Sequence, residues 1–497
     1  MELQFHNKPL RCMRQVAWDT KNEEQTLEIR VTDDMPAVDK ILAVWGQPVI
    51  RSKEWNGDLA TVSGGVLAWV LYDGQNGEGP QKVEGWIPFQ FKWNLEDSSR
   101  DGVFHTQWLL RSIDARLTGA GKLMVRASVS ALGQGMEETD LALYRSGELP
   151  EDVQTKTEQL TICIPAEAGE KVMLLDEELV IPPGGGEVGQ VLAYMLRPAI
   201  TEKKLMADKF VFRGVAKLQS VYIGTDGRIH AFESDVPISQ YTQLEQEYGP
   251  DAHLRLLPEV SELELEKLDG GRLRLKGSIV GQYSVWDSQT VEIVTDAYSN
   301  RRTVELQTAH VSLPDMIGEE IYEIQAQCRF PGGASETVAG TVCVSQPNVK
   351  REEDCASAVL EGTGQMIFYD GEGKLCSESK TWETKMELAG VEDPQTTLRL
   401  DGYAVLDLGA DDTGVVQKLA LSVTDIQNKD IEMVSGLSLG ELEKPDPSRP
   451  SLILCSTGGR SLWEIAKELG SKVSDICAAN DLEGEPDPKK MLVIPVE

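Results

Sequence analysis

Apolar and polar residues alternate in short runs over most of the chain. Examples are Leu27–Val31, Leu123–Val129 and Leu273–Ile279. A period of two is that of a β-strand with one face in a core and the other in water. The Asp-Gly and Gly-Gly pairs that separate such runs suit hairpin turns, which need positive φ angles. Helical periodicity is scarce before residue 450, with Pro237–Tyr248 as one short candidate, so the pattern predicts a mainly β protein.

An internal repeat organises these runs, with an offset of 149–150 residues between its first two copies. Each copy has a proline-ended strand, a glycine-to-tyrosine strand, a short block around a proline and a glycine-led strand. The matching segments are Ile41–Pro48 with Val191–Pro198, Gly65–Tyr72 with Gly214–Tyr222, Trp86–Phe89 with Asp235–Ile238, and Gly121–Val125 with Gly271–Leu275. Four blocks in one order at one offset are hard to obtain by chance, so we infer a true repeat.

A third, more degenerate copy follows at Val338–Pro347, Gly362–Tyr369 and Leu419–Val423. Its proline block is missing, and Thr381–Glu383 stands in that place. Units of roughly 150 residues with many short strands predict β domains of a sandwich-like or barrel-like kind.

Linkers are expected near 146–158, 284–300 and 436–450, the last of which is rich in proline. The predicted organisation is therefore three β repeats, a proline-rich linker and a small C-terminal domain. Their residues are 1–145, 159–284 and 301–435 for the repeats, 436–450 for the linker and 451–497 for the C-terminal domain.

The length and charge of the chain agree with several soluble domains. A chain of 497 residues exceeds the size at which single cores stop growing. Its 81 acidic and 48 basic residues give a net charge of −33. Such a surface repels nucleic-acid phosphates and anionic lipid, although it would favour a basic partner. Neither a signal-type apolar segment in residues 1–18 nor an apolar run of 18 residues is present, so a cytoplasmic protein is expected.

The eight cysteines include no C-x-x-C pair, and several lie in apolar runs. We expect buried, reduced thiols at Cys12, Cys163, Cys328, Cys343, Cys355, Cys376, Cys455 and Cys477. Four of them lie between residues 328 and 376, which leaves a disulfide in that stretch as an alternative.

The segment after residue 450 changes to a strand–helix–helix–strand pattern. Ser461 and Glu464 form a capping box, in which the hydroxyl and the carboxylate each accept a backbone N–H at the helix start. Leu462, Ile465, Ala466 and Leu469 follow on one helix face, and Gly470 ends the helix. A second helix is predicted over Val473–Ala479, between strands at Ser451–Leu454 and Met491–Pro495.

This segment resembles LysM domains. The motif is carried by Gly459, Ser461, Leu462-Trp463, Ile465-Ala466, Asn480-Asp481-Leu482 and Ile494-Pro495. The resemblance implies a shallow site for glycans that contain N-acetylglucosamine, between the loop before the first helix and the loop after the second. The residues that it assigns to ligand or partner binding are Gly459, Arg460, Ser461, Leu462, Trp463, Asn480, Asp481, Leu482 and Pro488.

The same loops depart from the family pattern. Arg460 replaces an aspartate, Lys489 replaces a glycine, and residues 483–487 make the second loop acidic. The ligand is therefore either glycan or protein, with a tilt towards protein. Trp463 either packs inside the domain or contacts the ligand.

Three β repeats followed by one LysM-type module are similar to the SPOCS-domain proteins of spore-forming Firmicutes, and more narrowly to SipL-type morphogenetic proteins. The proline-ended and glycine-to-tyrosine strands of the repeat carry this resemblance, with Ile87-Pro88-Phe89. It implies synthesis in the mother-cell cytoplasm, recruitment to the forespore surface and a scaffold role in coat and cortex assembly. It also implies binding to the coat basement-layer ATPase SpoIVA, with the LysM module implicated. The alternative is an anchor that binds peptidoglycan of the cortex or cell wall.

Motifs that suggest catalysis have simpler explanations. Gly436–Gly440 matches a nucleophile elbow but is followed by the proline-rich linker rather than a helix, which predicts a linker serine. Asp412–Gly414 is predicted as a turn, and Gly119–Lys122 as a hairpin. The five histidines do not occur at metal-ligand spacing. We therefore expect no enzyme, no cofactor and no metal site.

Overall fold

The computed structural model describes residues 2–75, 78–98, 101–119, 121–145, 147–182, 186–331, 334–351, 356–408, 412–443 and 450–496. Strands make up 77% of the structure and helices 4%, which confirms the mainly β prediction. All strand pairings in the described part are antiparallel, and none of its sheets closes into a barrel. No helix of the described part is long and apolar enough to span a bilayer.

Six sheets of the same kind occur as three pairs, which we call the first, second and third β units. In each unit, one sheet joins the first, last and fifth long strands, and the other joins the second, third and fourth. The first unit has β2 (His6–Arg30), β7 (Lys122–Arg145) and β6 (Val103–Gly119) in one sheet, and β3 (Val38–Asn56), β4 (Leu59–Gly74) and β5 (Pro80–Asn94) in the other.

The second and third units repeat this strand order. The second has β8 (Val153–Val180), β13 (Arg272–Ser299) and β12 (His253–Lys267) facing β9 (Val188–Met206), β10 (Lys209–Gly224) and β11 (Ile229–Gln243), with a short 3₁₀ turn, η2 (Asp269–Gly271), before β13. The third has β14 (Val304–Pro331), β20 (Asp412–Leu439) and β19 (Pro394–Leu408) facing β15 (Ala334–Val344), β17 (Ala356–Asp370) and β18 (Leu375–Leu388). Two short strands complete the third unit: β16 (Asn348–Arg351) pairs with β17, and β1 (Glu2–Gln4) pairs with β20.

Alternation along the strands produces the core of each unit. In β5, Phe89, Phe91 and Trp93 are buried while the residues between them are exposed. The Phe91 ring meets Trp108 of β6 edge-on, with centroids 5.0 Å apart. Each aromatic side chain buried in this way contributes about 2–3 kcal/mol. The two sheets of a unit thus share one hydrophobic core.

A close backbone approach explains the glycine of the repeat. A methyl group at Gly64, Gly214 or Gly362 would overlap a carbonyl oxygen of the neighbouring strand, which belongs to Val49, Ala199 and Cys343 respectively. Strand pairing shifts by one residue next to Gly64 and Gly214, as expected at a β-bulge. The sequence alignment placed Gly65 opposite Gly214, but the structure makes Gly64 its equivalent.

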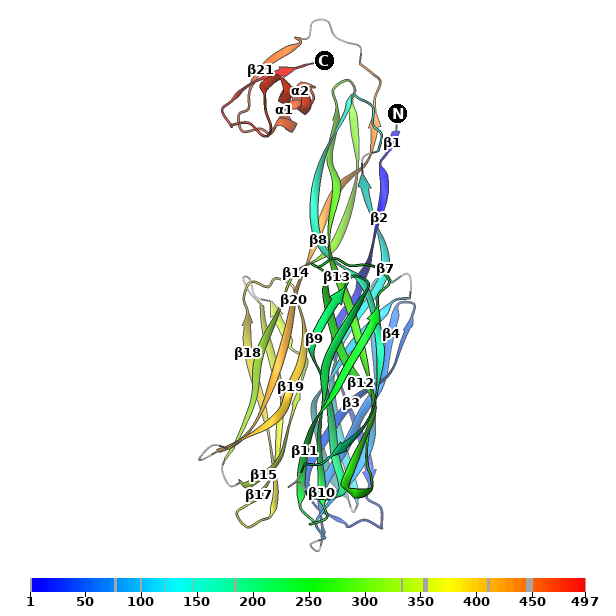
Figure 1. Cartoon of the computed structure of the whole chain (residues 1–497), viewed down its shortest axis with the longest axis vertical. Helices are drawn as coiled ribbons and strands as arrows, with labels where there is room; N and C mark the ends of the chain where they lie inside the picture. Colours follow the sequence, from blue (N-terminus) through cyan, green and yellow to red (C-terminus); the bar gives the residue numbers. More distant parts are fainter. Residues whose placement is uncertain are drawn as a thin grey trace.

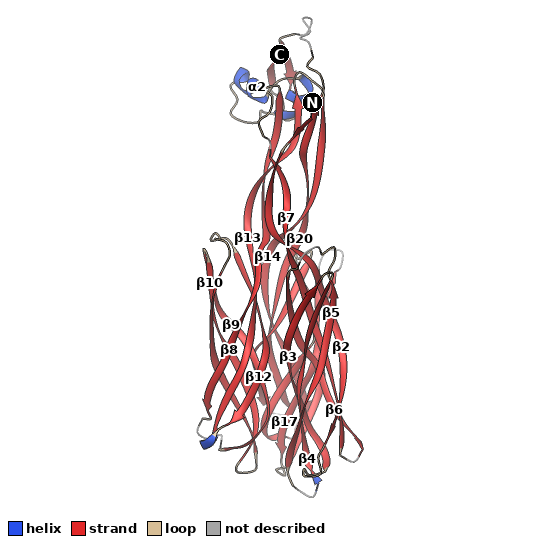
Figure 2. Ribbon diagram, turned by 90° about the vertical axis from the view of Figure 1, so that its right-hand side faces the viewer, coloured by secondary structure: helices blue, strands red, loops and turns tan. Residues whose placement is uncertain are grey.

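The first and last strands of each unit are the longest, at 24–28 residues, and extend past the other strands. Their protruding ends come together as a narrow stalk above the three units (Figure 1, Figure 2). The stalk has its own hydrophobic core, to which every unit contributes. Its residues are Cys12, Leu143, Ile162, Ile164, Val291, Ile293, Leu313, Ile431 and Met433, with Phe5, Val153, Val294, Ala297, Val434, Leu437 and Leu439 nearer the tip.

The stalk overturns several local predictions. Strand β8 begins at Val153 and β13 runs to Ser299, so residues 153–158 of the predicted linker 146–158 and residues 284–299 of the predicted linker 284–300 are strand. Gly436–Leu439 belongs to β20 and is not linker, because Leu437 is buried in the stalk. Residues 444–449 of the predicted linker 436–450 lie outside the described residues. The repeat boundaries 1–145, 159–284 and 301–435 stay predictions.

Other local predictions have mixed outcomes. The segment 237–248 is not helical: its first part is the end of β11, in which Ile238 is buried. Asp412–Gly414 forms the start of β20 rather than a turn, because it pairs with both β14 and β19. At the hairpin predicted over Gly119–Lys122, Gly119 of β6 pairs with Lys122 of β7 as expected, and Ala120 lies outside the described residues. Seven cysteines are free thiols, among them Cys328, Cys343 and Cys376, whereas Cys355 lies outside the described residues.

The three units close into a ring. Strand β12 of the second unit packs on β3 of the first, β6 of the first on β15 of the third, and β19 of the third on β9 of the second. Each unit thus offers its fifth strand to the second strand of a neighbour, which is the geometry of a cyclic trimer made within one chain.

Buried polar side chains fix the register of this ring. The side-chain oxygen of Gln47 accepts the backbone N–H of Leu196 at 2.9 Å. That of Gln107 accepts the N–H of Leu398 at 3.0 Å. The Arg197 guanidinium, which is partly buried, donates to the buried Gln417 at 2.8 Å. Because each bond crosses from one unit to another, a shift of any unit would leave a buried polar group unpaired.

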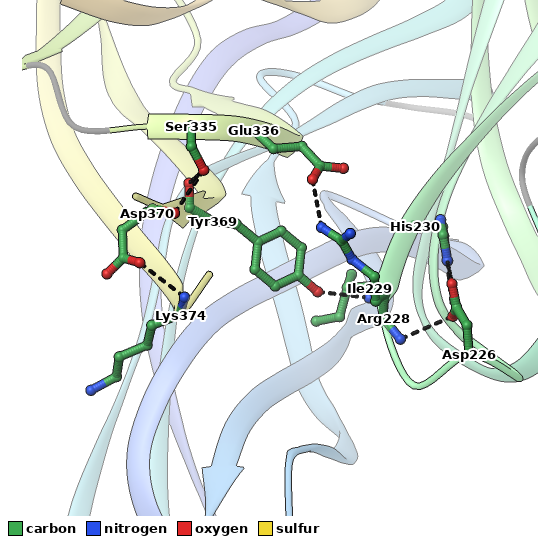
Figure 3. Close-up of polar contacts among 9 residues, drawn as sticks. All are labelled: Asp226, Arg228, Ile229, His230, Ser335, Glu336, Tyr369, Asp370 and Lys374. Atoms are coloured by element: carbon green, nitrogen blue, oxygen red, sulfur yellow. Dashed lines mark hydrogen bonds and ion pairs between the residues drawn. The ribbon is translucent and has the colours of Figure 1, made fainter. Parts of the chain in front are cut away.

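The second and third units also meet at the end opposite the stalk (Figure 1), and Figure 3 shows the contact. Arg228, from the β10–β11 hairpin, lies over the ring of Tyr369, 4.7 Å from its centroid, and pairs with Glu336 at 2.5 Å. The Tyr369 hydroxyl accepts the N–H of Ile229 at 3.0 Å. The hairpin is held for this contact by Asp226, which accepts the N–H of Arg228 at 3.0 Å.

The glycine constraint gives the first prediction. We expect Gly214→Ala to destabilise the protein by about 2–3 kcal/mol, because the new methyl group must displace the Ala199 carbonyl. Gly249→Ala is the matched control in the same unit, since a Cβ there meets nothing within 4 Å. Urea unfolding followed by tryptophan fluorescence measures both. Equal midpoints for the two variants would refute the bulge as the reason for this glycine.

Candidate functional site

Residues 450–496 form a separate unit, which we call the C-terminal module. It consists of β21 (Leu452–Ser456), α1 (Leu462–Leu469), α2 (Val473–Asn480) and β22 (Met491–Pro495), in the order that the sequence predicts. The two strands pair antiparallel, and both helices pack on one face of this small sheet. The core residues are Leu462, Ile465, Ala466, Ile476, Leu492, Ile494 and Val496.

The capping box at the start of α1 is present as predicted. Glu464 accepts the backbone N–H of Ser461 at 2.8 Å, and the Ser461 hydroxyl accepts the N–H of Glu464 at 3.3 Å. Gly470 ends the helix in the left-handed region, at φ 64°. These bonds fix the loop before α1, in which Gly459 also needs a positive φ, of 84°.

Arg460 is folded back against the module. Its guanidinium donates to Cys455 Sγ and to the Ser456 carbonyl, both at 3.1 Å, and forms an ion pair with Glu468. The hydrogen bond to Cys455 and the Glu468 carboxylate raise the pKa of Arg460. Arg460, which stands where the LysM pattern has an aspartate, therefore links β21 to α1.

The acidic second loop reaches across to the first. The Glu485 carboxylate accepts the backbone N–H of Leu462 at 2.9 Å, which is one of the unpaired amides at the start of α1. The Thr457 hydroxyl donates to the Asp487 carbonyl at 3.1 Å. The two loops that were expected to hold a glycan between them are thus joined to each other by the chain itself.

The Asn-x-Leu motif holds the module together. Both polar atoms of the Asn480 side chain are used: its amide nitrogen donates to the carbonyls of Ile476 and Val493 at 2.8 and 2.6 Å, and its oxygen accepts the N–H of Val493 at 2.8 Å. Asp481 caps α2 at φ 50° with its side chain in water, and Leu482 packs partly into the core. Among the predicted binding residues, Gly459, Asp481 and Pro488 are exposed.

Trp463 faces the stalk. Its indole N–H donates to Asp296 of β13 at 2.8 Å, and its ring meets Tyr298 edge-on at 4.9 Å. Lys467, one turn further along α1, donates to both oxygens of Asp296 at 2.8 Å. The buried Tyr298 hydroxyl donates to the Ser471 carbonyl at 2.8 Å. Helix α1 therefore docks the module on the end of β13.

One exposed face of the module is apolar. Leu452, Leu454 and Met491 are 60%, 71% and 57% exposed. Strand register places them on the face of the β21–β22 sheet that points away from the helices, together with Val493 and Pro495. We call these five residues the outer face. Exposed apolar surface of this kind is typical of contact sites. The outer edge of β22 beside it is covered at Val493, whose N–H and carbonyl both bond the Asn480 side chain.

Sequence reasoning missed the residues on both sides of the module. Asp296 and Tyr298 lie more than 160 positions from the tryptophan that they contact, and no local pattern connects them. The outer face had a signal, since exposed Leu452 and Leu454 alternate with partly buried Ile453 and Cys455 in β21.

A substitution tests the docking contact. Asp296→Ala removes the acceptor for both Trp463 and Lys467, which should weaken docking by about 1–2 kcal/mol. Hydrogen exchange at residues 294–299 and 462–471 should then accelerate. Glu292→Ala, at an exposed position of the same strand, is the control and should leave exchange unchanged. Identical exchange in the two variants would argue against docking through Asp296.

The docking contact should also depend on pH. Partial burial disfavours the charged form of Asp296, but hydrogen bonds from Lys467 and Trp463 outweigh it and lower its pKa. The contribution of Asp296 to docking depends on its ionised carboxylate. It is fully present above the ordinary aspartate pKa of about 4, and it is lost as the pH falls through the lowered pKa of docked Asp296. The NMR signal of the Trp463 indole N–H should therefore stay constant from pH 7 to pH 5 and move towards a free-indole position below about pH 4. A signal that does not move in acid would contradict this linkage.

Comparison with known proteins found a family match for one part of the chain. Residues 187–268 match the family model described as SipL, SPOCS domain. The match spans β9 to β12, the four strands that lie between the two stalk strands of the second unit. Comparisons with curated proteins and with solved structures gave no match. The SPOCS part of the resemblance is thus supported, in the second β unit.

Proposed function

We propose that this protein is a non-enzymatic assembly factor of a bacterial spore envelope, which acts as a scaffold through protein contacts. The observation that carries the proposal is the SPOCS match at residues 187–268, which is consistent with a role in sporulation. The repetition of the same strand order in the first and third units extends this argument to the rest of the β region.

The architecture suits a scaffold. Buried bonds between units, such as those of Gln47 and Gln107, favour one fixed arrangement of the ring. The stalk carries the C-terminal module away from the ring, close to the end of β13 (Figure 1). A partner held by the module would therefore be kept at a set distance and orientation from a partner held by the β units.

We propose further that the C-terminal module is a LysM-type domain that binds a protein rather than a glycan. Glu485 bridges the two loops of the expected glycan site, and the Asn480 amide is satisfied inside the module. The outer face, with Leu454 at its centre, offers apolar surface of the kind that protein partners bury. The partner that the family resemblance suggests is the basement-layer ATPase SpoIVA, met at the forespore surface by a protein made in the mother-cell cytoplasm.

Affinity capture tests this proposal. Immobilised SpoIVA should retain the full chain from a sporulating lysate, and deletion of residues 451–497 should abolish retention. Leu454→Asp should weaken binding about tenfold or more, because it places a charge in the proposed interface. The control is Leu174→Asp, at a position that is 82% exposed on β8. Equal losses for the two aspartate variants, or full retention of the deletion variant, would refute the proposed contact.

A second assay separates the peptidoglycan alternative. Co-sedimentation with purified peptidoglycan should not exceed that of a variant without residues 451–497 if the ligand is protein. Saturable sedimentation that is unchanged by Leu454→Asp and lost in the exposed-loop variant Asp481→Ala would instead favour a glycan anchor. These substitutions avoid Asn480, whose removal would damage the module itself.

A further inference from the structure

A cavity lies where the three β units meet. Its volume is about 390 Å³, and all three units contribute to its lining. A smaller cavity of about 120 Å³ adjoins it and shares Gln107, Pro198, Pro258, Leu398 and Arg399 with it. The lining of the larger cavity includes three cationic side chains, Arg255, Lys203 and Arg399, and two carboxylates, Glu202 and Glu319.

Arg255 of β12 is incompletely paired. Its side chain is 11% exposed, and Nη1 is buried without a hydrogen-bond partner in the described part of the chain. Its nearest carboxylate is Glu319, whose Oε1 lies 3.9 Å from Nε, too far for a hydrogen bond. That same oxygen already accepts the Ser422 hydroxyl at 2.9 Å. Glu319 therefore partly balances the charge of Arg255, but the N–H groups of Arg255 Nη1 make no hydrogen bond in the described part of the chain.

Arg399 of β19 has the same deficiency. Its Nε is buried without a partner among the described residues, and its other nitrogens lie 3.5 Å from the Ile200 carbonyl and 3.8 Å from Asp401. Lys203 donates to the Leu254 carbonyl at 2.7 Å and is 3.8 Å from Glu319. Two units therefore each contribute to the lining of one cavity an arginine with an unused, buried N–H group.

Two other cations, Lys53 and Arg302, are by contrast well paired. Lys53 donates to the Phe104 carbonyl and to Gln282, both at 3.0 Å, and pairs with Glu170. Arg302 holds Asp152 through two bonds of 2.6 and 2.7 Å. A buried donor without an acceptor costs about 1–3 kcal/mol, so two such arginines at one cavity point to an acceptor beyond those that the described residues supply.

We propose that this cavity binds a small organic anion, whose carboxylate or phosphate oxygens accept N–H groups of Arg255 and Arg399. Guanidinium is the side chain best suited to either oxyanion, because its planar donors match the spacing of the two oxygens. Ile200, Leu256 and Ile321 line the same cavity and would contact an apolar body that carries the anionic group. Because Arg255 belongs to the second unit and Arg399 to the third, the ligand would tie these two units together.

Thermal unfolding of the full chain at pH 7 tests this site, with inorganic phosphate and citrate as probes and sodium chloride at matched ionic strength as reference. We expect a saturable rise in Tm with at least one probe, and the responding probe tells phosphate from carboxylate. Arg255→Gln should raise the half-saturating concentration about tenfold or more. Arg272→Gln, which loses an exposed pair with Glu178, is the control and should respond as the wild type does.

Arg399→Gln provides a second route if Arg255→Gln does not fold, and it should weaken the response in the same way. A response to neither probe beyond that of sodium chloride would overturn the proposal. So would a response that Arg255→Gln and Arg399→Gln leave unchanged. Neither outcome bears on the spore-envelope proposal, which rests on the SPOCS match and on the C-terminal module.

Discussion

The structure depends on one kind of interaction, the long antiparallel ladder between the first and last strand of each β unit. In the second unit this ladder runs from Val153 opposite Ser299 to Val180 opposite Arg272. Its lower part is one sheet of a sandwich, and its upper part is one third of the stalk. The same strands therefore serve two hydrophobic cores. Because the paired residues lie up to 146 positions apart in sequence, each unit forms only after its last strand is available.

The ring of units adds a second level of order. Its contacts use the second and fifth strands of each unit, which leaves the ladders free to continue into the stalk. Side chains of Gln47, Gln107 and Arg197 form hydrogen bonds with residues of a neighbouring unit. Such bonds contribute little net stability but make a wrong register costly. The same meeting point places Arg255 and Arg399 at one cavity, so ring closure and the proposed anion site have a common origin.

Local chemistry was predictable from sequence, and long-range packing was not. The Ser461–Glu464 capping box and the Gly119–Lys122 hairpin follow from residues a few positions apart, and both are present. The repeat was visible because Gly64 and Gly214 both lie too close to a neighbouring carbonyl oxygen for any side chain to fit. The sequence alignment placed Gly65, one residue away, in this position. The stalk was missed because the alternation of apolar and polar residues in β8 does not tell whether the apolar face of this strand packs on the second sheet of its own unit or on the long strands of the other two units. Asn480 belongs to a motif associated with binding, but its side chain forms hydrogen bonds to the backbone of Ile476 in α2 and of Val493 in β22 and so joins the two elements.

Docking of the C-terminal module has a mechanical consequence. The module is joined covalently to the chain that leaves β20, and it is held without a covalent bond on β13 through Asp296 and Tyr298. A pull on the module therefore divides between two ladders of the stalk. Force along a strand loads the hydrogen bonds of an antiparallel ladder in shear, so that many must break together rather than one after another. A load on the module is therefore shared by two strand ladders, whereas a module held by a flexible linker alone would load only one.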